Sequence, residues 1–368
     1  MTFEMQVPEQ VLFGRKIRFQ LPSLLPEGNV FIICGKHAKE QIQTELLPRL
    51  ANRKVELFSS FPAEAPLDVT DEALTAARAL DAKIIIGWGG GSCIDGAKTV
   101  AALLGSGLDA AAAFKENPAL DTRSCFFAAL PTTAGTAAEM TPNAVLCDPA
   151  TGVKKSLRGK AMFADAALID PELLEGAPEE VLFGSGFDAL TQGIESTISA
   201  KADAMTMMLS AEGAFLTWKA LQRCAAGFRE PAVFDTLARG CMLSGAAFVR
   251  SGLGAAHGIG HPISGLKGVP HGVCCAVLLP EVLKWNLPAA RTKMEQLALR
   301  FGMETPEQVI DEVISLRRKC NLPENFKQWQ LSTADFPFIV KNCRSGSMKS
   351  NPRPFSDEEV CSFLEKLI

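Results

Sequence analysis

The chain has 368 residues, of which 47% are apolar and 21% are charged, and its formal net charge is −4. This length exceeds what one hydrophobic core usually organises, so the sequence predicts two domains. A slightly acidic chain without a basic stripe argues against a nucleic-acid partner. Apolar runs such as those at residues 83–88 and 125–130 are far shorter than the ~20 residues of a membrane helix, which argues against a membrane-spanning segment.

The beginning of the chain and its cysteines predict the cellular compartment. Residues 1–5 show no basic patch followed by an apolar stretch, so no secretory signal is expected. The 11 cysteines are scattered, their number is odd, and none forms a C-x-x-C pair, although Cys274 and Cys275 are adjacent. Reduced thiols and a cytoplasmic protein are therefore the expectation.

The first half of the chain alternates short β-branched runs with stretches of helical spacing. Wholly apolar strands separated by helices are typical of a parallel sheet that is covered on both faces. We therefore predict strands at residues 29–34, 54–58, 83–88 and 125–130, and helices at about 38–50, 68–80 and 94–104.

After about residue 178 the pattern changes, because strand-like runs almost disappear and Ala, Leu, Met and Glu recur at helical spacing. The sequence thus predicts an α/β domain over residues 1–177 and a helical domain over residues 178–368. A cleft between the two domains is the place where a binding site is expected. The clearest helical patterns lie at residues 205–223, 233–249, 289–301 and 306–319.

A glycine-rich loop follows the predicted strand at residues 83–88. Gly89, Gly90 and Gly91 remove every Cβ, so backbone N–H groups can approach a pyrophosphate closely. The positive N-terminal end of the next helix would face the same anion. A turn without a ligand is the alternative, since this is not the G-x-G-x-x-G pattern. The strand–loop–helix context favours a nucleotide site, whose further candidate residues are Ser92, Asp95 and Lys98.

A second polar loop follows the strand at residues 125–130. Hydroxyl groups of Thr132, Thr133 and Thr136 could hold a ribose, a phosphate or a carboxamide. In isolation this segment would be only a threonine-rich turn. Two such loops at the carboxyl ends of neighbouring strands suit one elongated nucleotide.

Three of the 4 histidines fall in one short segment, at His257, His261 and His271. Neutral imidazoles bind Zn²⁺ or Fe²⁺, usually together with a carboxylate. Asp188 is the expected carboxylate, because an acid in an otherwise apolar helix needs a partner, and Gln192 lies on the same helical face. Alternatively, the histidines fill the core, and the aspartate is stabilised by the positive end of the helix dipole. For three histidines together, we favour a metal site.

Taken together, these segments resemble the iron-containing (group III) alcohol dehydrogenases. This resemblance implies a Rossmann-like parallel-sheet domain followed by a helical domain, which is the dehydroquinate synthase-like fold, and a nicotinamide cofactor. It also implies one divalent metal ion held by an aspartate and three histidines. The resemblance runs nearly end to end, through residues 11–14, 89–98, 131–139, 170–173, 188–195, 252–272 and 351–354.

By matched position, the resemblance implies Asp188, His257 and His271 as metal ligands and His261 as a catalytic proton relay beside the substrate. The family's remaining histidine falls at Gln192, whose neutral carbonyl oxygen is a weaker and harder donor. Gln192 could ligate weakly, leave its place to water, or shift the metal from Fe²⁺ to Zn²⁺ or Mn²⁺. Three protein ligands plus an open position would still be a usual catalytic arrangement.

Two further departures concern the cofactor and the substrate. Many relatives carry an aspartate after the first strand, where this chain has Gly35 and Lys36, so NADP(H) becomes tolerable and NAD(H) is not excluded. Arg250 and Lys267 lie near the histidines, where relatives often carry small polar or aromatic residues. Each could be a solvated surface cation, or both could bind the anionic tail of a substrate such as sulfoacetaldehyde, a phosphonate or a carboxylate.

The sequence therefore predicts a metal-dependent, NAD(P)-linked alcohol dehydrogenase or aldehyde reductase that acts on a small aldehyde or primary alcohol. One alternative is a lyase like dehydroquinate synthase, which regenerates its NAD internally. Another is a catalytically silent nucleotide-binding protein that lost its metal through Gln192. The resemblance also implies a homodimer or a larger homo-oligomer.

Overall fold

The computed structural model describes residues 4–368, which divide into two compact units. The sheet unit comprises residues 6–133 and 137–177. The helical unit comprises residues 178–368, together with residues 134–136 and the described residues 4 and 5. The main division lies between Ala177 and Pro178, where the sequence pattern changes from alternating β and α segments to helices.

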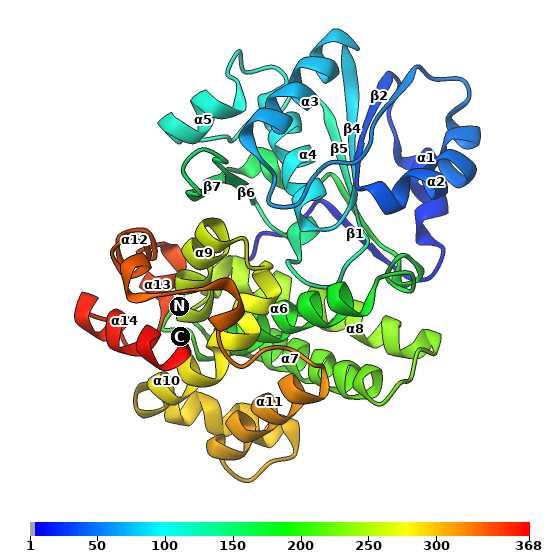
Figure 1. Ribbon diagram of the computed structural model, residues 1–368. Helices are drawn as coiled ribbons and strands as arrows, with labels where there is room; N and C mark the ends of the chain where they lie inside the picture. Colours follow the sequence, from blue (N-terminus) through cyan, green and yellow to red (C-terminus); the bar gives the residue numbers. More distant parts are fainter. Residues whose placement is uncertain (1–3) are drawn as a thin grey trace. The chain divides into compact units, whose positions relative to one another are not determined.

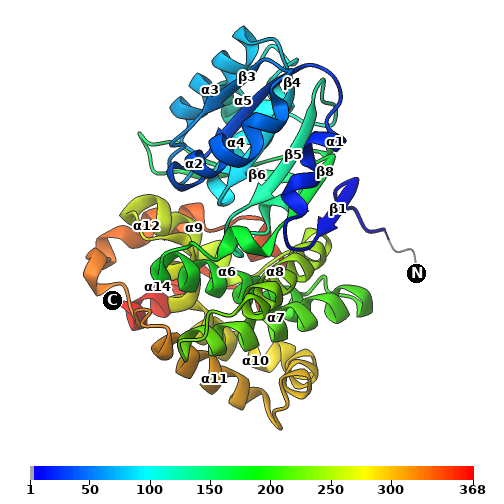
Figure 2. The same ribbon diagram turned by 90° about the vertical axis from the view of Figure 1, so that its right-hand side faces the viewer.

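A parallel sheet of 6 strands, in the order β1-β8-β5-β4-β2-β3, forms the centre of the sheet unit (Figures 1 and 2). The predicted Rossmann-like fold with parallel strands is therefore confirmed. β6 and β7 form a separate antiparallel pair. The strands are β1 (Gln10–Phe13), β2 (Asn29–Cys34), β3 (Val55–Phe58), β4 (Ala82–Gly89), β5 (Phe126–Pro131), β6 (Asn143–Cys147), β7 (Lys154–Arg158) and β8 (Ala166–Ile169).

Both faces of this sheet are buried, which explains its continuous apolar strands. In β2, Phe31 and Ile33 belong to one core cluster, whereas Val30 and Ile32 belong to another. Successive side chains of a strand point to opposite faces, so each face has its own core. The helices of this unit are α1 (Leu21–Leu24), α2 (Lys39–Gln41), α3 (Leu67–Ala79), α4 (Gly91–Leu103) and α5 (Ala110–Glu116).

The segment predicted as a helix at residues 38–50 is helical throughout, but it is not one regular α-helix. The segment consists of α2, a π-helical turn at Ile42–Leu46 and a 3₁₀ turn at Leu47–Leu50. Pro48 lies in the last turn, where its missing N–H and its ring prevent regular helix hydrogen bonding. The sequence also gave no prediction for β1 and β8, since each has only 4 residues.

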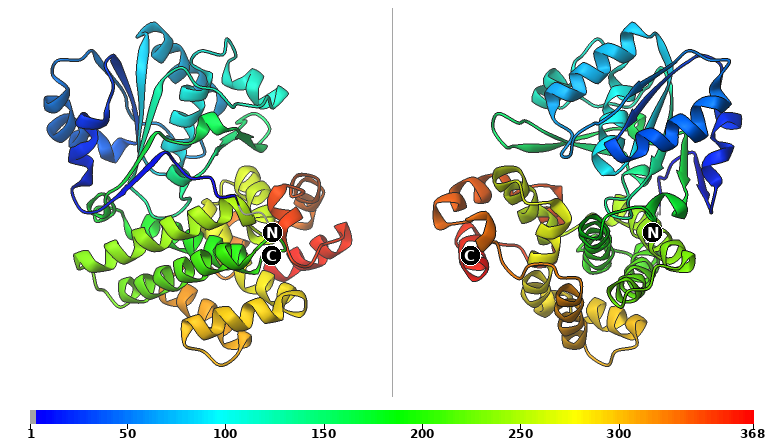
Figure 3. Two further views of the ribbon diagram at one scale, coloured as in Figure 1. Left: turned by 180° about the vertical axis from the view of Figure 1, so that it is seen from behind. Right: turned by 45° about the vertical axis from the view of Figure 1, so that its right-hand side comes forward.

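The helical unit is built around α6, whose residues 186–198 are all buried, and α6 packs against α7, α8 and α10 (Figure 3). A Cβ on Gly193 would lie 2.9 Å from Cβ of Ala214 in α7 and 2.8 Å from Oγ of Ser244 in α8. Small residues thus let three helix backbones approach closely. The helices are α6 (Glu179–Ile198), α7 (Ala204–Ala225), α8 (Pro231–Ser251), α9 (Ala255–Lys267), α10 (His271–Phe301), α11 (Pro306–Lys319), α12 (Phe336–Asn342), α13 (Gly346–Ser350) and α14 (Asp357–Leu364).

Helix α10 begins 18 residues before the predicted start at residue 289 and has 31 residues. It continues through Pro280 and Pro288, although proline in a helix interior removes a hydrogen bond and usually kinks or breaks the helix. Both α8 and α10 are long and apolar enough to cross a membrane, but 56% and 67% of their most apolar windows are buried within the protein. We interpret them as core helices of a soluble fold.

Candidate metal centre

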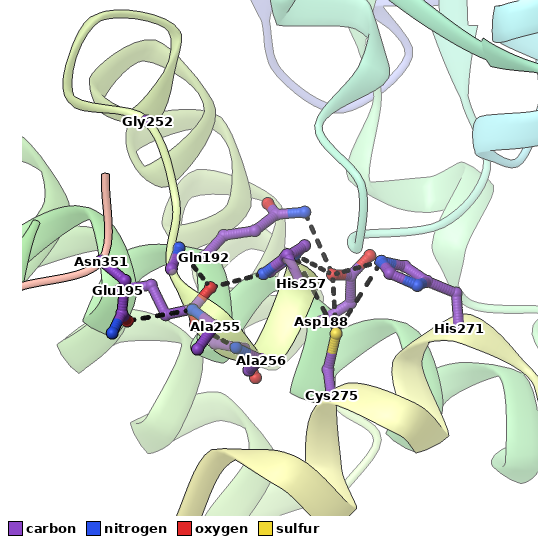
Figure 4. Close-up of polar contacts among 12 residues, drawn as sticks. Asp188, Gln192, Glu195, Gly252, Ala255, Ala256, His257, His271, Cys275 and Asn351 are labelled. Atoms are coloured by element: carbon purple, nitrogen blue, oxygen red, sulfur yellow. Dashed lines mark hydrogen bonds and ion pairs between the residues drawn. The ribbon is translucent and has the colours of Figure 1, made fainter. Parts of the chain in front are cut away.

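Asp188, His257, His271 and Cys275 form one buried cluster inside the helical unit (Figure 4). Asp188 comes from α6, His257 from α9, and His271 and Cys275 from the first turns of α10. Their potential ligand atoms all lie within 4.8 Å of one another. Nε2 of His257 is 3.1 Å from Oδ1 of Asp188, and Nε2 of His271 is 3.7 Å from the same oxygen.

Close packing between α6 and α10 brings His271 to Asp188. A Cβ on Gly272 would lie 2.0 Å from the carbonyl oxygen of Gly184, so only glycine permits this approach of the two backbones. His271 and Cys275 are separated by four residues and therefore share one face of α10. The same spacing relates Asp188 to Gln192 on α6.

Glu195 fixes the orientation of His257. It lies two turns after Asp188 on α6 and is fully buried. Its Oε2 is 2.6 Å from Nδ1 of His257 and accepts a hydrogen bond from the N–H of Gly254, while Oε1 accepts one from Ala256. A carboxylate at Nδ1 favours the tautomer with a lone pair on Nε2, the atom that faces Asp188.

Asn351 completes the support of α9. Its Oδ1 accepts a hydrogen bond of 3.0 Å from the N–H of Ala255, the first residue of the helix. A Cβ on Gly254 would lie 2.6 Å from Oε1 of Glu195 and 3.0 Å from Oδ1 of Asn351, so glycine is required at this position. The N-terminal N–H groups of α9, which have no partner within the helix, are thus bound by two side chains from distant segments.

The electrostatics of the cluster favour a positive charge. Burial alone would raise the pKa of Asp188, but His271, His257 and Cys275 hold it below its ordinary value of 3.8. Burial alone would lower the pKa of His257, but Cys275, Asp188 and Glu195 raise it well above 6.5. A carboxylate held ionised beside a second buried acid is an environment that a divalent cation would neutralise.

Gln192 is buried beside Asp188, with 3% of its surface exposed. Its Nε2 donates a hydrogen bond of 3.2 Å to Oδ1 of Asp188, and its buried Oε1 has no hydrogen-bond partner among the described residues. The set of carboxylate, imidazole and thiol donors fits a divalent metal ion. The residues present therefore fit the metal that the family resemblance implies.

His261 lies one turn after His257 on α9 and is partly exposed. Its ring centre is 4.9 Å from that of His271 and 6.2 Å from that of His257. It is not among the residues whose potential ligand atoms gather within 4.8 Å, so it lies beside the cluster.

The predicted nucleotide loops meet at the carboxyl ends of neighbouring strands in the sheet unit. The N–H of Thr132 donates a hydrogen bond of 2.9 Å to the carbonyl oxygen of Gly89. A Cβ on Gly90 would lie 3.5 Å from Oγ1 of Thr133, and a Cβ on Gly89 would lie 3.4 Å from the N–H nitrogen of Gly35. Gly91 begins α4, so the N-terminal N–H groups of that helix open onto this junction.

The remaining candidates for cofactor binding have different environments. Ser92 accepts a hydrogen bond from the N–H of Glu64. Asp95 accepts a hydrogen bond from the N–H of Val145, and the fully buried Lys98 donates to Thr141 and to the carbonyl oxygen of Asn143. Both side chains thus connect α4, which follows the glycine-rich loop, to β6 and the residues just before it. Lys36 is exposed after β2, and Thr136 is grouped with the helical unit.

Arg250 and Lys267, the candidates for binding an anionic substrate, already have carboxylate partners. Nε of Arg250 is 2.8 Å from Oδ2 of Asp203, and Nζ of Lys267 is 2.8 Å from Oδ2 of Asp335. These contacts agree with the alternative interpretation of each residue as a surface cation in an ion pair.

The sequence analysis missed two residues of the site, Glu195 and Cys275. Each had a signal in its spacing, because Glu195 lies two helical turns after Asp188 and Cys275 lies one turn after His271. The pattern placed both residues on the same helical faces as candidate ligands.

Comparison with known proteins identifies the class of protein. The family described as iron-containing alcohol dehydrogenase matches residues 8–171, and its C-terminal region matches residues 183–368. The chain is 28% identical over 357 residues to 1-propanol dehydrogenase PduQ of Salmonella typhimurium, covering 92% of this chain and 93% of the relative. Fold and donor groups together define an NAD-binding oxidoreductase that acts on alcohols. The chain belongs to the iron-containing alcohol dehydrogenase family, as the sequence resemblance predicted.

Solved structures support the same fold. The crystal structure of a 1,3-propanediol oxidoreductase superimposes with a TM-score of 0.91 at 25% identity and covers 100% of both chains. A sulfoacetaldehyde reductase from Bifidobacterium kashiwanohense, solved with NAD⁺, gives a TM-score of 0.91 at 21% identity and covers 100% of this chain and 99% of that chain. The second likeness concerns the fold alone.

Proposed function

We propose that the chain reversibly reduces a small aldehyde to a primary alcohol, using a nicotinamide cofactor and a divalent metal ion bound by Asp188, His257 and His271. The observation that carries this proposal is the convergence of one buried carboxylate and two imidazoles from three helices, with both imidazole Nε2 atoms within 3.7 Å of one aspartate oxygen. Membership of the alcohol dehydrogenase family supports the reaction class.

Each residue of the site has a chemical role in this proposal. The bound ion would supply a Lewis acid that makes the aldehyde carbon a better hydride acceptor. Glu195 orients His257 and holds its tautomer. His261, partly exposed beside His271, would exchange a proton between the substrate oxygen and solvent.

We further propose an uncharged, short-chain substrate rather than one with a sulfonate, phosphonate or carboxylate tail. The anionic alternative depended on Arg250 and Lys267, and each of these is already paired with an aspartate. An anionic tail would have to displace those carboxylates, and the exchange of one ion pair for another gains little affinity. The names of the relatives, 1-propanol dehydrogenase and 1,3-propanediol dehydrogenase, favour the same class of substrate.

The exposed Lys36 after β2 supports use of NADP(H) in addition to NAD(H). A cytoplasmic location and a homodimer or larger homo-oligomer stay predictions from the sequence.

The proposal is tested with the full-length chain loaded in turn with Fe²⁺, Zn²⁺ and Mn²⁺. Oxidation of NADH and of NADPH is followed by absorbance, with propanal, with sulfoacetaldehyde and without aldehyde. We expect metal-dependent oxidation of the cofactor that equals the alcohol formed, with propanal preferred. Faster turnover of sulfoacetaldehyde would restore the anionic alternative.

The same assays separate the rival functions. A lyase would convert its substrate without net consumption of the cofactor. A silent nucleotide-binding protein would bind the cofactor but reduce no aldehyde under any metal loading. Either result would overturn the proposed dehydrogenase.

A further inference from the structure

We propose that Cys275, and not Gln192, supplies the fourth protein ligand of the metal centre, so that one carboxylate, two imidazoles and one thiolate hold the ion. This inference rests on the metal site of the proposed function and specifies its chemistry. Cys275 replaces the missing family histidine from a different helix, since Gln192 lies on α6 and Cys275 on α10 (Figure 4).

The distances around Cys275 have the dimensions of a tetrahedral site. Bonds of about 2.0–2.3 Å to nitrogen, oxygen and sulfur require ligand atoms roughly 3.3–3.7 Å apart. Sγ of Cys275 is 3.7 Å from Oδ1 of Asp188, 4.0 Å from Nε2 of His257 and 3.8 Å from Nε2 of His271. With the aspartate–histidine distances of 3.1 and 3.7 Å, these form five of the six edges of one tetrahedron.

The environment of Cys275 differs from that of an ordinary buried cysteine. A free cysteine in a core usually packs as a small hydrophobic residue. Cys274, the next residue along the helix, is equally buried and does this, within an apolar cluster that includes Ile259 and Val277. Cys275 is also 0% exposed, but its Sγ faces a carboxylate and two imidazoles.

Gln192 is oriented for another role. The Nε2 group, which cannot bind a cation, is directed at Asp188, and it donates to the oxygen that forms one vertex of the tetrahedron. Hydrogen bonds of this kind orient a ligating carboxylate. Gln192 thus acts as a positioning residue for Asp188, while the thiol completes the set of donors.

A thiolate ligand changes which metal the site prefers. Two anionic ligands neutralise the charge of a divalent ion, whereas an aspartate and a neutral glutamine would leave one positive charge. Soft thiolates favour Zn²⁺ over Mn²⁺ and other ions that prefer oxygen ligands. Fe²⁺ also accepts nitrogen and sulfur ligands, but it binds a given set of such ligands more weakly than Zn²⁺ does. Of the metals that the sequence left open, the donor set selects Zn²⁺, with Co²⁺ as its spectroscopic substitute.

The experiment loads the metal-free, full-length chain with Co²⁺ under reducing conditions and records its absorption spectrum. The wild-type chain should show an intense sulfur-to-cobalt charge-transfer band in the near ultraviolet. The band should be lost in Cys275→Ser, and it should persist in Cys274→Ser, the matched control, and in Gln192→Leu. Zn²⁺ affinity, measured by competition with a chelator, should fall by more than about 100-fold in Cys275→Ser. Loss of a residue that only hydrogen-bonds to a ligand costs about 10–100-fold in affinity, and loss of the ligand itself should cost more.

X-ray absorption of the wild-type Zn²⁺ protein gives a second measurement that needs no variant. One sulfur at about 2.3 Å would support the thiolate ligand, and a shell of nitrogen and oxygen alone would overturn it. Stoichiometric Co²⁺ binding without the charge-transfer band would overturn the role of Cys275 while leaving the proposed dehydrogenase intact. A wild-type chain that binds no divalent ion would overturn the metal site itself, and with it the proposed function.

Discussion

Two clusters of buried charged groups in this protein are neutralised in different ways. In the sheet unit, Lys98 is fully buried, lies 3.8 Å from Asp95, and donates hydrogen bonds of 2.7 Å to Thr141 and to the carbonyl oxygen of Asn143. In the helical unit, Asp188 and Glu195 are buried against imidazoles and a thiol. The first cluster contains its own positive charge, the ammonium group of Lys98. The second is a set of potential metal ligands whose ligand atoms lie close together.

The pKa values of the two clusters reflect this difference. Burial lowers the pKa of Lys98 to about 8, and it raises the pKa of Asp95 to about 6 and that of Glu139 to about 7. Desolvation thus dominates in the sheet unit. In the helical unit, the neighbours of Asp188 outweigh burial and lower its pKa. The lysine cluster thus contains its own counter-charge, while the acidic cluster is the one at which we propose a bound cation.

The largest expected effect comes from removing a ligand. His257→Ala should lower kcat/KM by more than about 10³-fold, because a Lewis acid contributes several kcal/mol to the transition state. The circular dichroism spectrum should be unchanged. Steady-state kinetics with propanal measure this, and retained turnover would remove the metal from the proposed mechanism.

Breaking the lysine cluster should affect the fold rather than the metal. Lys98→Met leaves Asp95 buried without its cation, which should reduce the free energy of unfolding by about 3–5 kcal/mol. Urea denaturation measures the change, and the double variant Asp95→Asn/Lys98→Met should recover part of it. Zn²⁺ stoichiometry should stay at the wild-type level. Loss of Zn²⁺ binding would contradict the claim that the lysine cluster affects the fold and not the metal site.

Glu195→Gln tests whether Glu195, which contacts the proposed ligand His257, strengthens metal binding. The amide keeps the size of the side chain but weakens the hydrogen bond to Nδ1 of His257, so Zn²⁺ affinity should fall by about 10–100-fold. Competition with a chelator measures the affinity. Glu139→Gln, which changes a buried acid of the sheet unit, is the matched control and should have wild-type affinity. An equal fall in both variants would indicate a general loss of stability.

The smallest effects are expected at the surface ion pairs. Arg250→Met and Lys267→Met each remove a partly exposed ion pair, and ion pairs at the surface contribute about 0–1 kcal/mol. The ratio of kcat/KM for propanal and sulfoacetaldehyde should change by less than about 5-fold, since 1 kcal/mol is roughly a factor of five. A large and selective loss of activity toward sulfoacetaldehyde would mean that these cations bind the substrate.

The sequence predicted the sheet unit well where strands were long and wholly apolar, as in β2 and β4. It gave no prediction for β1 and β8, because a 4-residue run carries too little periodicity to distinguish a strand from a loop. The early part of α10 was missed because Pro280 normally ends a helix. There, burial against α6 and α9 outweighs the missing hydrogen bond.

The candidate site was predicted through histidines and one aspartate, because these residue types are rare in apolar helices. Cys275 was not predicted, although it lies one helical turn after His271, because the predicted helix began only at residue 289 and this spacing has meaning only within a helix. The contacts of Asn351 and Glu195 with the start of α9 depend on tertiary packing between segments far apart in the chain. Local patterns carry no information about such contacts.

The account depends most on one divalent ion bound by the cluster of Asp188, His257, His271 and Cys275. The most direct test is the Zn²⁺ content of the dialysed wild-type chain and of Asp188→Ala, measured by elemental analysis after loading. We expect one ion for each wild-type chain and none in the variant, with both proteins folded. Equal zinc content in the two proteins, or no zinc in either, would contradict the account.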